Sequence, residues 1–314
     1  MNELALAVFA SETGTHLIRP PASARWRSHL RSFDERAYVQ LLSERGLRFT
    51  AQLPPLLRSI HDPPPGLFVR GSAPLDLLSR PAVAIVGARA CSGYGASVAR
   101  TLARELAAAG LVVVSGLARG VDGEAHRGAL EAGGLTVAVL GCGVDRDYPA
   151  AHADLARRIC ELGLVVSEYA PGVEPAPWRF PARNRIVAGL CAATVVVEAR
   201  ERSGALITAD LALEEGREVF AVPGEITSAL SGGTNGLLKL GAAPLTSAAD
   251  VLASFGIEAV RDAACSPLLD LLPATADELV RVTGRPAEEI ARDLVELELD
   301  NRVTCHDGVY RRGA

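Results

Sequence analysis

Val83-Ala84-Ile85-Val86-Gly87-Ala88-Arg89 is the stretch of sequence that decides the fold class. A short apolar run ends there in a glycine turn, and an amphipathic helical stretch follows at 96–109. Similar apolar runs recur at 111–114, 137–140, 164–166, 194–197 and 219–222, with helical stretches at 121–132, 153–162 and 205–215. Strands that are buried on both faces and alternate with helices predict an α/β fold with a doubly wound, mainly parallel sheet.

Two expected linkers divide the chain into three parts. Asp62-Pro63-Pro64-Pro65-Gly66 is expected to be a linker after a small helical N-terminal region, residues 1–65. The alternating runs occupy residues 66–257, and residues 258–264 are expected to form a second linker. Residues 265–314 begin with two periodic helical stretches and end with two short strands around a turn, which predicts a winged-helix domain.

Charge is distributed unevenly over these parts. The net charge of −5 disfavours a general nucleic-acid-binding protein, although local fields can differ from the net value. The N-terminal region carries 8 arginines against 6 acids, and residues 265–314 carry 6 arginines against 10 acids. Because a module that reads duplex DNA needs a positive face, the winged helix is not expected to bind DNA by itself. Of the 32 basic residues only Lys239 is a lysine, and arginine suits bidentate phosphate contacts.

Composition excludes several classes of protein. Hydrophobic residues make up 49% and charged residues 22%, which excludes a mostly disordered chain. No apolar run approaches the length of about 18 residues that a membrane span needs, and the start lacks the basic segment of a secretory signal. The six cysteines occur singly, which predicts neither a zinc site nor a disulfide framework. We therefore expect a cytoplasmic protein without a membrane span.

The turn from Gly87 to Gly95 predicts a phosphate site. Its glycines let the backbone approach a ligand, the helix N-terminus that follows favours an anion, and Arg89 adds a charged fork. A tight turn without a ligand is the alternative. The spacing G-x-G-x-x-G is absent here, the second run ends in Ser115-Gly116 rather than in an acid, and no G-x-x-x-x-G-K-[ST] loop occurs. Nicotinamide and P-loop nucleotide chemistry are therefore not expected, and no cofactor is predicted.

The most informative run is Trp178-Arg179-Phe180-Pro181-Ala182-Arg183-Asn184-Arg185-Ile186. Aromatic faces stack on bases while arginines hold phosphates, which is how proteins grip single strands. A solvated basic helix start is the alternative interpretation. Two later loops also offer backbone N–H groups: Ser203-Gly204 follows the fifth run, and residues 231–236, which resemble a phosphate nest, follow the last.

Several residues that often carry chemistry have plainer interpretations in this sequence. Asp122 is expected to cap N–H groups near a helix start rather than to catalyse. His126, one turn further on, is expected to pair with Asp122 or to pack, and Cys142 to be a small buried residue. The loop at 141–149 has too few clustered ligands for a metal. No catalytic residue and no metal site is assigned.

A series of motifs, taken in order, resembles the DprA/Smf family of bacterial DNA-processing proteins of natural transformation. Any one of them is weak, but the ordered set is highly specific and covers about residues 66–255. The matching runs are Ala84–Arg89, Ser115–Asp122, Tyr148-Pro149, Phe180–Arg185, Val196–Ala199, Ser203–Ala209 and Gly216–Gly224.

This resemblance implies an extended Rossmann-like core that binds single-stranded DNA without a cofactor. It implies a binding protein rather than an enzyme, which dimerises, cooperates with single-strand-binding protein, protects incoming DNA and loads the RecA recombinase. The family's turn that contacts DNA phosphate maps to Gly87, Ala88 and Arg89, and the run that borders the same basic pocket to Phe180 and Arg183–Arg185. The candidate DNA-binding residues are thus Gly87, Ala88, Arg89, Gly116, Arg119, Trp178, Phe180, Arg183, Asn184, Arg185, Ser203, Gly204, Gly232, Gly233 and Asn235.

This chain departs from the family pattern at three places. Ala88 stands where the family often has serine, His152 stands where it often has asparagine, and the first 60 residues lack the expected glycine-rich hairpins. Two other functions stay open on the sequence. One is a nucleotide-binding or nucleoside-monophosphate-hydrolysing enzyme that uses Glu198 and the loop at 231–234. The other is a protein-interaction scaffold that docks through the acidic winged helix, which is compatible with DNA binding.

Overall fold

Strand β3 (Ala82–Val86) is buried at every residue and lies inside a nine-stranded sheet of the computed structural model. The structure describes residues 2–14, 17, 19–257, 268–299, 302–306 and 308–312. Residues 1–258 and residues 259–314 form two compact units, each of which is described by itself. The expected linker at 258–264 lies outside the described residues.

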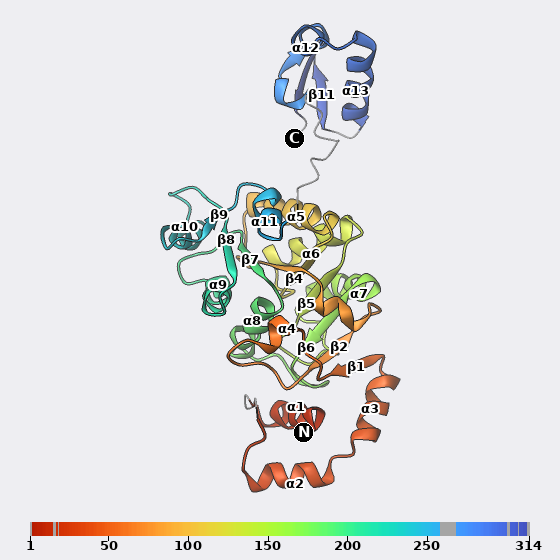
Figure 1. Ribbon diagram of the computed structural model, residues 1–314, viewed down its shortest axis with the longest axis vertical. Helices are drawn as coiled ribbons and strands as arrows, with labels where there is room; N and C mark the ends of the chain where they lie inside the picture. Colours follow the sequence, from red (N-terminus) through yellow and green to blue (C-terminus); the bar gives the residue numbers. More distant parts are fainter. Residues whose placement is uncertain are drawn as a thin grey trace. The chain divides into compact units, whose positions relative to one another are not determined.

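The sheet of the first unit has the strand order β1-β2-β6-β5-β4-β3-β7-β8-β9 (Figure 1). All neighbours from β6 to β9 pair in parallel, whereas β1–β2 and β2–β6 pair antiparallel. The strands besides β3 are β1 (Leu47–Thr50), β2 (Leu67–Arg70), β4 (Val112–Ser115), β5 (Thr136–Val139), β6 (Leu164–Ser167), β7 (Ala193–Val196), β8 (Glu218–Ala221) and β9 (Ala243–Pro244). The predicted α/β class with a mainly parallel, Rossmann-like sheet is confirmed.

The chain order creates a switch point between β3 and β7. From β3 the chain adds β4, β5 and β6 in one direction, and it then returns to place β7 on the other side of β3. The connections after β3 and β7 therefore leave the sheet toward opposite faces, and a crevice opens where they separate. This topology alone marks the ends of β3 and β7 as the place where a ligand is expected.

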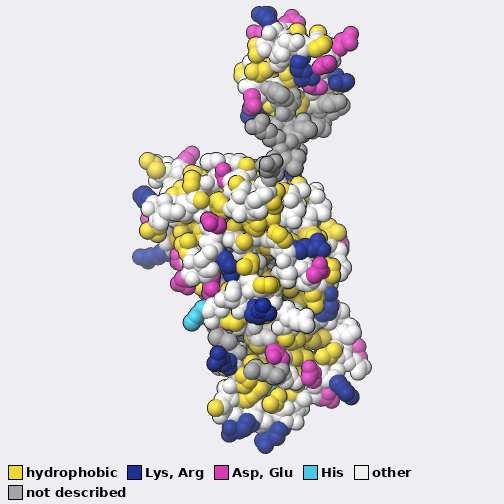
Figure 2. Space-filling model, in the orientation of Figure 1, with side chains coloured by type: hydrophobic (Ala, Val, Ile, Leu, Met, Phe, Trp, Pro, Cys, Tyr) yellow, Lys and Arg dark blue, Asp and Glu magenta, His cyan; other side chains and the backbone are white. Residues whose placement is uncertain are grey.

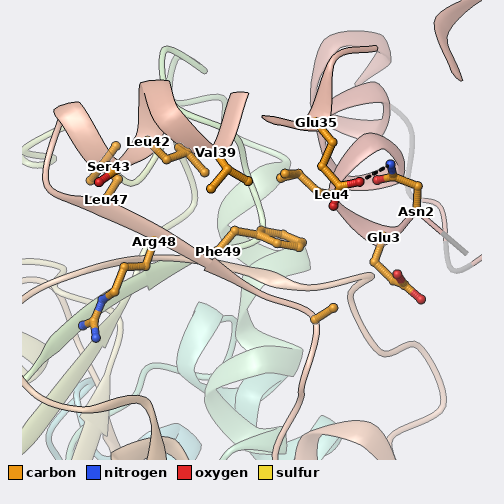
Figure 3. A pocket seen from close by; sticks show the side chains of 11 residues that line it. Asn2, Glu3, Leu4, Glu35, Val39, Leu42, Ser43, Leu47, Arg48 and Phe49 are labelled. Carbon is orange, nitrogen blue, oxygen red and sulfur yellow. Dashed lines mark hydrogen bonds between the residues drawn. The ribbon is translucent and has the colours of Figure 1, made fainter. Parts of the chain in front are cut away.

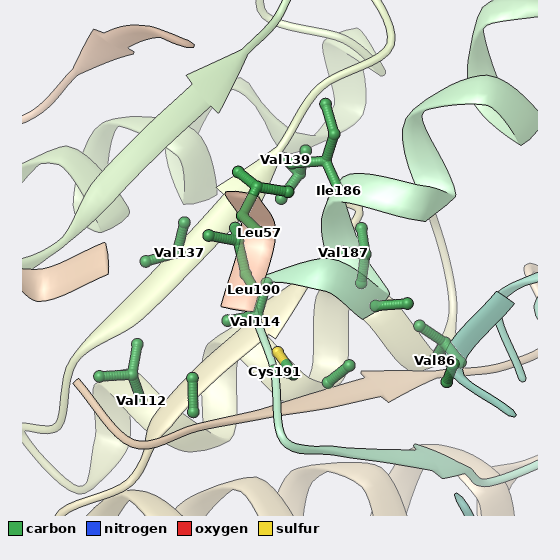
Figure 4. Close-up of a cluster of buried hydrophobic side chains, with 14 of the residues drawn as sticks. Leu57, Val86, Val112, Val114, Val137, Val139, Ile186, Val187, Leu190 and Cys191 are labelled. Carbon is green, nitrogen blue, oxygen red and sulfur yellow. The ribbon is translucent and has the colours of Figure 1, made fainter. Parts of the chain in front are cut away.

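Alternation along the strands buries both faces of the sheet. Ala82, Ala84 and Val86 pack with α4, α8, α9 and α10, and Figure 4 shows part of this cluster around Leu57 and Ile186. The intervening Val83 and Ile85 pack with α5, α6 and α11. The helices are α4 (Pro55–Arg58), α5 (Gly93–Ala108), α6 (Val121–Glu131), α7 (Ala153–Leu162), α8 (Arg179–Gly189), α9 (Gly204–Glu214), α10 (Gly232–Lys239) and α11 (Ala248–Ser254). Small residues such as Ala99 and Ala103 let these helices approach the sheet closely.

The N-terminal region contains the helices α1 (Glu3–Thr13), α2 (Ala24–Ser32) and α3 (Glu35–Glu44), and it ends with the short α4, as its helical spacing predicts. It also contributes β1, which pairs antiparallel with β2 and was not expected in a helical region. The proposed boundary at residue 65 stays a prediction, because residues 1–258 form one compact unit. Arginine side chains gather at the end of this unit formed by α2 (Figure 2).

A hollow of about 750 Å³ lies between α1, α3 and β1. Leu4, Leu42 and Phe49 form its apolar side, and Asn2 donates a hydrogen bond of 2.9 Å to Glu35 at its rim (Figure 3). It lies on the N-terminal helices, and none of the residues that line it belongs to the ends of the parallel strands.

The second unit has the predicted winged-helix architecture. Its strands β10 (Ala274–Thr275), β11 (Val303–His306) and β12 (Val309–Arg312) form a sheet of order β10-β12-β11. Its helices are α12 (Ala276–Thr283) and α13 (Ala287–Leu299). Leu279, Ile290, Leu294 and Val303 form the core between helices and sheet. In the part of the chain that the structure describes, no helix is long and apolar enough to cross a membrane.

Candidate nucleic-acid interface

A cleft of about 220 Å³ opens at the ends of β3 and β7, where the topology predicts a ligand. We call it the switch-point cleft. The side chains that line it come from the turn after β3, the loop after β4, the start of α8 and the start of α9. Its lining is Val86, Gly87, Arg89, Gly116, Ala118, Asp122, Phe180, Pro181, Arg183, Asn184, Val187, Ser203, Gly204, Ala205 and Thr208.

The turn after β3 is held by the strand end beside it. The Ala88 N–H donates a hydrogen bond of 2.7 Å to the Glu198 carbonyl, and a Cβ at Gly87 would lie 2.6 Å from Val121. The Glu198 carboxylate accepts hydrogen bonds of 2.9 Å and 2.5 Å from the N–H and hydroxyl of Ser92, which caps α5. Glu198 is 6% exposed, so both of its oxygens serve to fix the start of α5. This geometry does not present Glu198 to a substrate in the cleft, as the hydrolase alternative requires.

Arg89 and Phe180 together form the exposed wall of the cleft. The Arg89 guanidinium carbon lies 5.5 Å from the centre of the Phe180 ring, which is a cation–π contact. Phe180 in turn stacks on Tyr148, with ring centres 5.3 Å apart and planes inclined by 24°. A neighbouring hollow of about 380 Å³ shares Arg89 and Phe180 and adds Tyr148 and the exposed Arg119. Tyr148 was not among the candidate site residues, and the only signal for it was its place in the Tyr148-Pro149 motif.

Arg183 lies at the floor of the cleft and is 4% exposed. Its guanidinium donates hydrogen bonds to the carbonyls of Gly116, at 2.7 Å, and Val139. Burial lowers the pKa of Arg183, and the nearby Asp122 carboxylate acts in the opposite direction. Burial raises the pKa of Asp122, and Arg183 and the N–H groups of Gly116 and Ala118 oppose that shift. The two side chains thus form a buried, mutually dependent pair.

The loop after β4 is held in place by buried polar side chains. Asp122 accepts hydrogen bonds from the N–H groups of Gly116 and Ala118, at 3.1 and 3.3 Å, so it binds the preceding loop and not the helix start itself. His152 Nδ1 donates to the carbonyl of Leu117, whose φ is +58°. Because Asp122 and His152 hold this loop from its buried side, the backbone that bears the exposed Arg119 is fixed in position.

The start of α9 completes the cleft. Ser203 caps this helix, and its hydroxyl accepts a hydrogen bond from the Ala205 N–H at 3.3 Å. Asn184 donates a hydrogen bond of 3.2 Å to the Gly204 carbonyl, which ties α8 to α9. A Cβ at Gly204 would meet nothing within 4 Å, so open space lies beside the first residue of this helix. Such a helix start favours an anion.

Arg185 does not line the cleft, although the sequence places it in the same run as Arg183. Its guanidinium binds both oxygens of Glu168 at 2.7 Å and lies 3.2 Å from Asp62. Both Arg185 and Glu168 are buried, so this ion pair joins α8 to the end of β6 and to the segment before β2. Contact of Arg185 with DNA stays a prediction, which this geometry does not favour.

Six other predicted residues also lie outside the lining of the cleft. Ala88 belongs to the turn after β3, and Arg119 lines the neighbouring hollow. Trp178 packs edge-on against Tyr169, 6.4 Å between ring centres, in a separate hollow beside α1. Gly232 and Gly233 begin α10, and Gly233 donates a hydrogen bond of 2.8 Å to the Ala199 carbonyl. Asn235 both donates to and accepts from the backbone of Gly224, at 3.0 and 3.2 Å. The loop at 231–236 therefore braces its neighbour, and its contact with DNA stays a prediction.

The plainer interpretations of two other residues agree with their surroundings. His126 is fully buried, and burial lowers its pKa to about 3. Cys142 is buried as well, and burial raises the pKa of its thiol to about 11, which disfavours the reactive thiolate. Among the described residues, no group of three His, Cys, Asp or Glu side chains is placed to hold a metal ion.

Comparison with known proteins assigns the chain to a family. The family model of DNA recombination-mediator protein A matches residues 47–256. The chain belongs to the DprA/Smf family. The model of the DprA winged-helix domain matches residues 264–309, in the second unit.

Curated relatives within DprA/Smf match over most of the chain. DNA processing protein DprA of Streptococcus pneumoniae is 51% identical over 199 residues, which are 63% of this chain and 70% of the relative. Protein Smf of Escherichia coli is 40% identical over 280 residues, which are 82% of this chain and 74% of that protein.

Solved DprA structures agree with the fold. That of S. pneumoniae DprA aligns with a TM-score of 0.69 and 39% identity, covering 80% of this chain and 92% of that one. A Helicobacter pylori structure, which addresses the single-stranded DNA binding mode of DNA processing protein A, aligns with a TM-score of 0.61 and 33% identity. It covers 67% of this chain and 95% of that one.

Proposed function

We propose that this recombination-mediator family member binds single-stranded DNA in the switch-point cleft. The observation that carries the proposal is the exposed Arg89 guanidinium against the face of Phe180, at the ends of parallel strands and beside the start of α9. Arginine supplies a phosphate contact, and the aromatic ring supplies a stacking surface for a base. The H. pylori relative whose single-stranded DNA binding mode is known supports the choice of ligand.

The proposed contacts fall into three groups. Arg89 and Arg119 are exposed and hold phosphates, whereas Phe180 and Tyr148 offer stacking surfaces. The N–H group of Gly204, at the start of α9, donates to a phosphate oxygen. Arg183 does not contact DNA itself but positions the loop at 116–120 through its hydrogen bond to the Gly116 carbonyl.

The test is a titration of fluorescent single-stranded and duplex oligonucleotides over a series of salt concentrations. Wild-type protein is expected to prefer the single strand, and Arg89→Ala to weaken binding and flatten the salt slope by about 0.7, the value of one phosphate contact. Arg104→Ala is the matched control, because Arg104 is an exposed arginine far along α5 from the cleft. Equal affinity for duplex, or an Arg89→Ala protein that behaves like Arg104→Ala, contradicts the proposal.

The role in the cell follows from the same cleft and from the family. We propose that the chain acts in the bacterial cytoplasm as a homodimer, protects incoming single strands, and loads the RecA recombinase with help from single-strand-binding protein. A RecA ATPase assay on DNA already coated with single-strand-binding protein tests this role. Wild-type protein is expected to shorten the lag before ATP hydrolysis, and Arg89→Ala to leave it long. An unchanged lag with wild-type protein contradicts RecA loading while leaving DNA binding intact.

A further inference from the structure

Helix α2 carries three exposed arginines, and two of them lie near its N-terminus, where a cation does not stabilise a helix. Arg25, Arg27 and Arg31 are exposed, and the helix has no acidic residue in its first turn. Cations near a helix N-terminus are disfavoured by the helix dipole, so Arg25 and Arg27 stand at the unfavourable end. Helix α3, by contrast, begins in the usual way with Asp34 as its cap and Glu35 in its first turn.

The direction of these arginines is fixed by Trp26. Trp26 is 6% exposed and packs on Phe9 of α1, with ring centres 5.3 Å apart. Since Trp26 points inward, Arg25 and Arg27 flank it on either side, and Arg31 lies toward the opposite face of the helix. Figure 2 shows basic side chains gathered at this end of the unit.

The acidic side chains near the cluster have other partners. The Asp34 carboxylate accepts a hydrogen bond from the Ala37 N–H, and Glu35 accepts one from Asn2. Glu12 lies 3.6 Å from His29. Within the described part of the chain, none of the three guanidinium groups of α2 forms an ion pair. Their positive field is therefore open to an external anion.

An aromatic cluster lies between this helix and the switch-point cleft. Trp178, 47% exposed, precedes Phe180 by two residues, and the Arg179 guanidinium carbon lies 5.0 Å from the ring centres of both Trp178 and Tyr169. This pairing of rings with an arginine repeats the chemistry of Arg89 and Phe180. It offers a second place where a base stacks beside a phosphate contact.

The same aromatic cluster contacts α1, and α2 packs on α1. Ala10 and Ser11 of α1 line one hollow with Tyr169 and Trp178, and the Ser11 hydroxyl accepts a hydrogen bond of 2.9 Å from the Ala170 N–H. Phe9 of α1 precedes Ala10 and forms a cation–π contact with Arg25. The Arg25 guanidinium carbon lies 5.9 Å from the centre of the Phe9 ring. Figure 1 shows α1 between α2 and the sheet.

We propose that Arg25, Arg27 and Arg31 of α2 form a second phosphate-binding surface for the same single strand, which reaches it from the cleft past Trp178 and Arg179. The proposal rests on the proposed function, because it extends the strand that the cleft holds. It assigns the N-terminal helical region to lengthening the footprint on single-stranded DNA. Short strands occupy the cleft alone, whereas longer strands also reach α2.

The test compares strand lengths with a triple variant, Arg25→Gln/Arg27→Gln/Arg31→Gln. Oligothymidylates from about 5 to about 40 nucleotides span the range from one subsite to several. The triple variant is expected to bind the short strands like wild type. For the long strands, its affinity is expected to fall about tenfold at low salt and its salt slope to flatten by about 2, or 0.7 for each of three phosphates.

The matched control is Arg104→Gln/Arg157→Gln/Arg158→Gln, which removes the same charge from exposed positions on α5 and α7. Thermal unfolding of both variants checks that their folds are intact.

The possible outcomes separate the two sites. If Arg89→Ala weakens binding to short strands but the triple variant binds long strands like the control, the second surface is refuted while the cleft stands. If wild type binds no single strand at all, the proposed function has failed. If the triple variant loses binding to vesicles rich in anionic lipid but keeps its long-strand affinity, the surface belongs to a membrane and the inference is wrong.

Discussion

The Nη1 atom of Arg183 lies 2.7 Å from the carbonyl oxygen of Gly116, and a Cβ built on Gly116 would lie 2.4 Å from that same nitrogen. The loop after β4 therefore has no room for a side chain at Gly116, and the arginine fills the space that a side chain would take. The neighbouring hollow depends on this contact as well, because its exposed Arg119 follows Gly116 by only three residues.

Gly116→Ala is expected to lower the free energy of unfolding by about 1–3 kcal/mol, since the buried guanidinium must move and lose hydrogen bonds. Urea unfolding measures the change. Gly204→Ala is the matched control, because a Cβ there meets nothing within 4 Å. An equal, near-zero effect of both substitutions contradicts the crowding at Gly116.

Arg183→Ala is expected to destabilise the fold by about 2–4 kcal/mol, because it leaves the buried Asp122 carboxylate without its opposing charge. Arg89→Ala, at an exposed position, is expected to change stability by about 0.5 kcal/mol or less. Adding Asp122→Asn to Arg183→Ala removes the uncompensated charge. The double variant is therefore expected to be more stable than the sum of the single effects, and strictly additive values rule out the coupling.

His126 is expected to make stability fall in acid. Thr136 donates its hydroxyl to the Val113 carbonyl, so His126 Nδ1 must donate to the Thr136 oxygen, 2.7 Å away. Among the described residues, the buried Nε2 has no hydrogen-bond partner. The folded pKa of about 3 lies below the ordinary 6.5, so the unfolded chain alone binds a proton between these values. As the pH falls through this window, the free energy of unfolding decreases by about 1.4 kcal/mol for each pH unit.

His126→Gln is expected to flatten this dependence of unfolding free energy on pH, measured by urea unfolding from pH 7 to pH 4. His61→Gln, at an exposed histidine, serves as the comparison and should leave the slope as in wild type. An unchanged slope in His126→Gln would mean that this imidazole accepts a proton in the folded state.

Phe180→Ala is expected to weaken single-strand binding by about 1–3 kcal/mol, the usual value of one stacked base, without changing the salt slope. The slope stays because no charge is lost, whereas Arg89→Ala lowers it. Fluorescence titrations at several salt concentrations separate the two effects. A flattened slope in Phe180→Ala would show that the ring acts only by holding Arg89.

The central fold could be predicted from the sequence because most parallel strands are short apolar runs that end in a glycine-rich or polar turn, as in Val83–Gly87. Strand β1 could not, because Leu47–Thr50 follows a helical stretch directly and becomes a strand only by pairing with β2. The same limit applies within the basic run. Arg183 and Arg185 look alike in sequence, but Glu168 binds Arg185 and the Gly116 loop binds Arg183. Those partners lie far away in the chain, so local pattern could not assign the roles.

The switch point also sets when the cleft can exist during synthesis. Its lining begins at Val86 and is complete only at Thr208 of α9, on the far side of the crossover from β6 to β7. A nascent chain that has emerged only as far as β6 exposes the turn at Gly87, but neither Phe180 nor Ser203 has emerged. The growing polypeptide therefore acquires this site only after more than half of its length has emerged, and a nascent fragment that ends earlier has no completed cleft with which to capture nucleic acid.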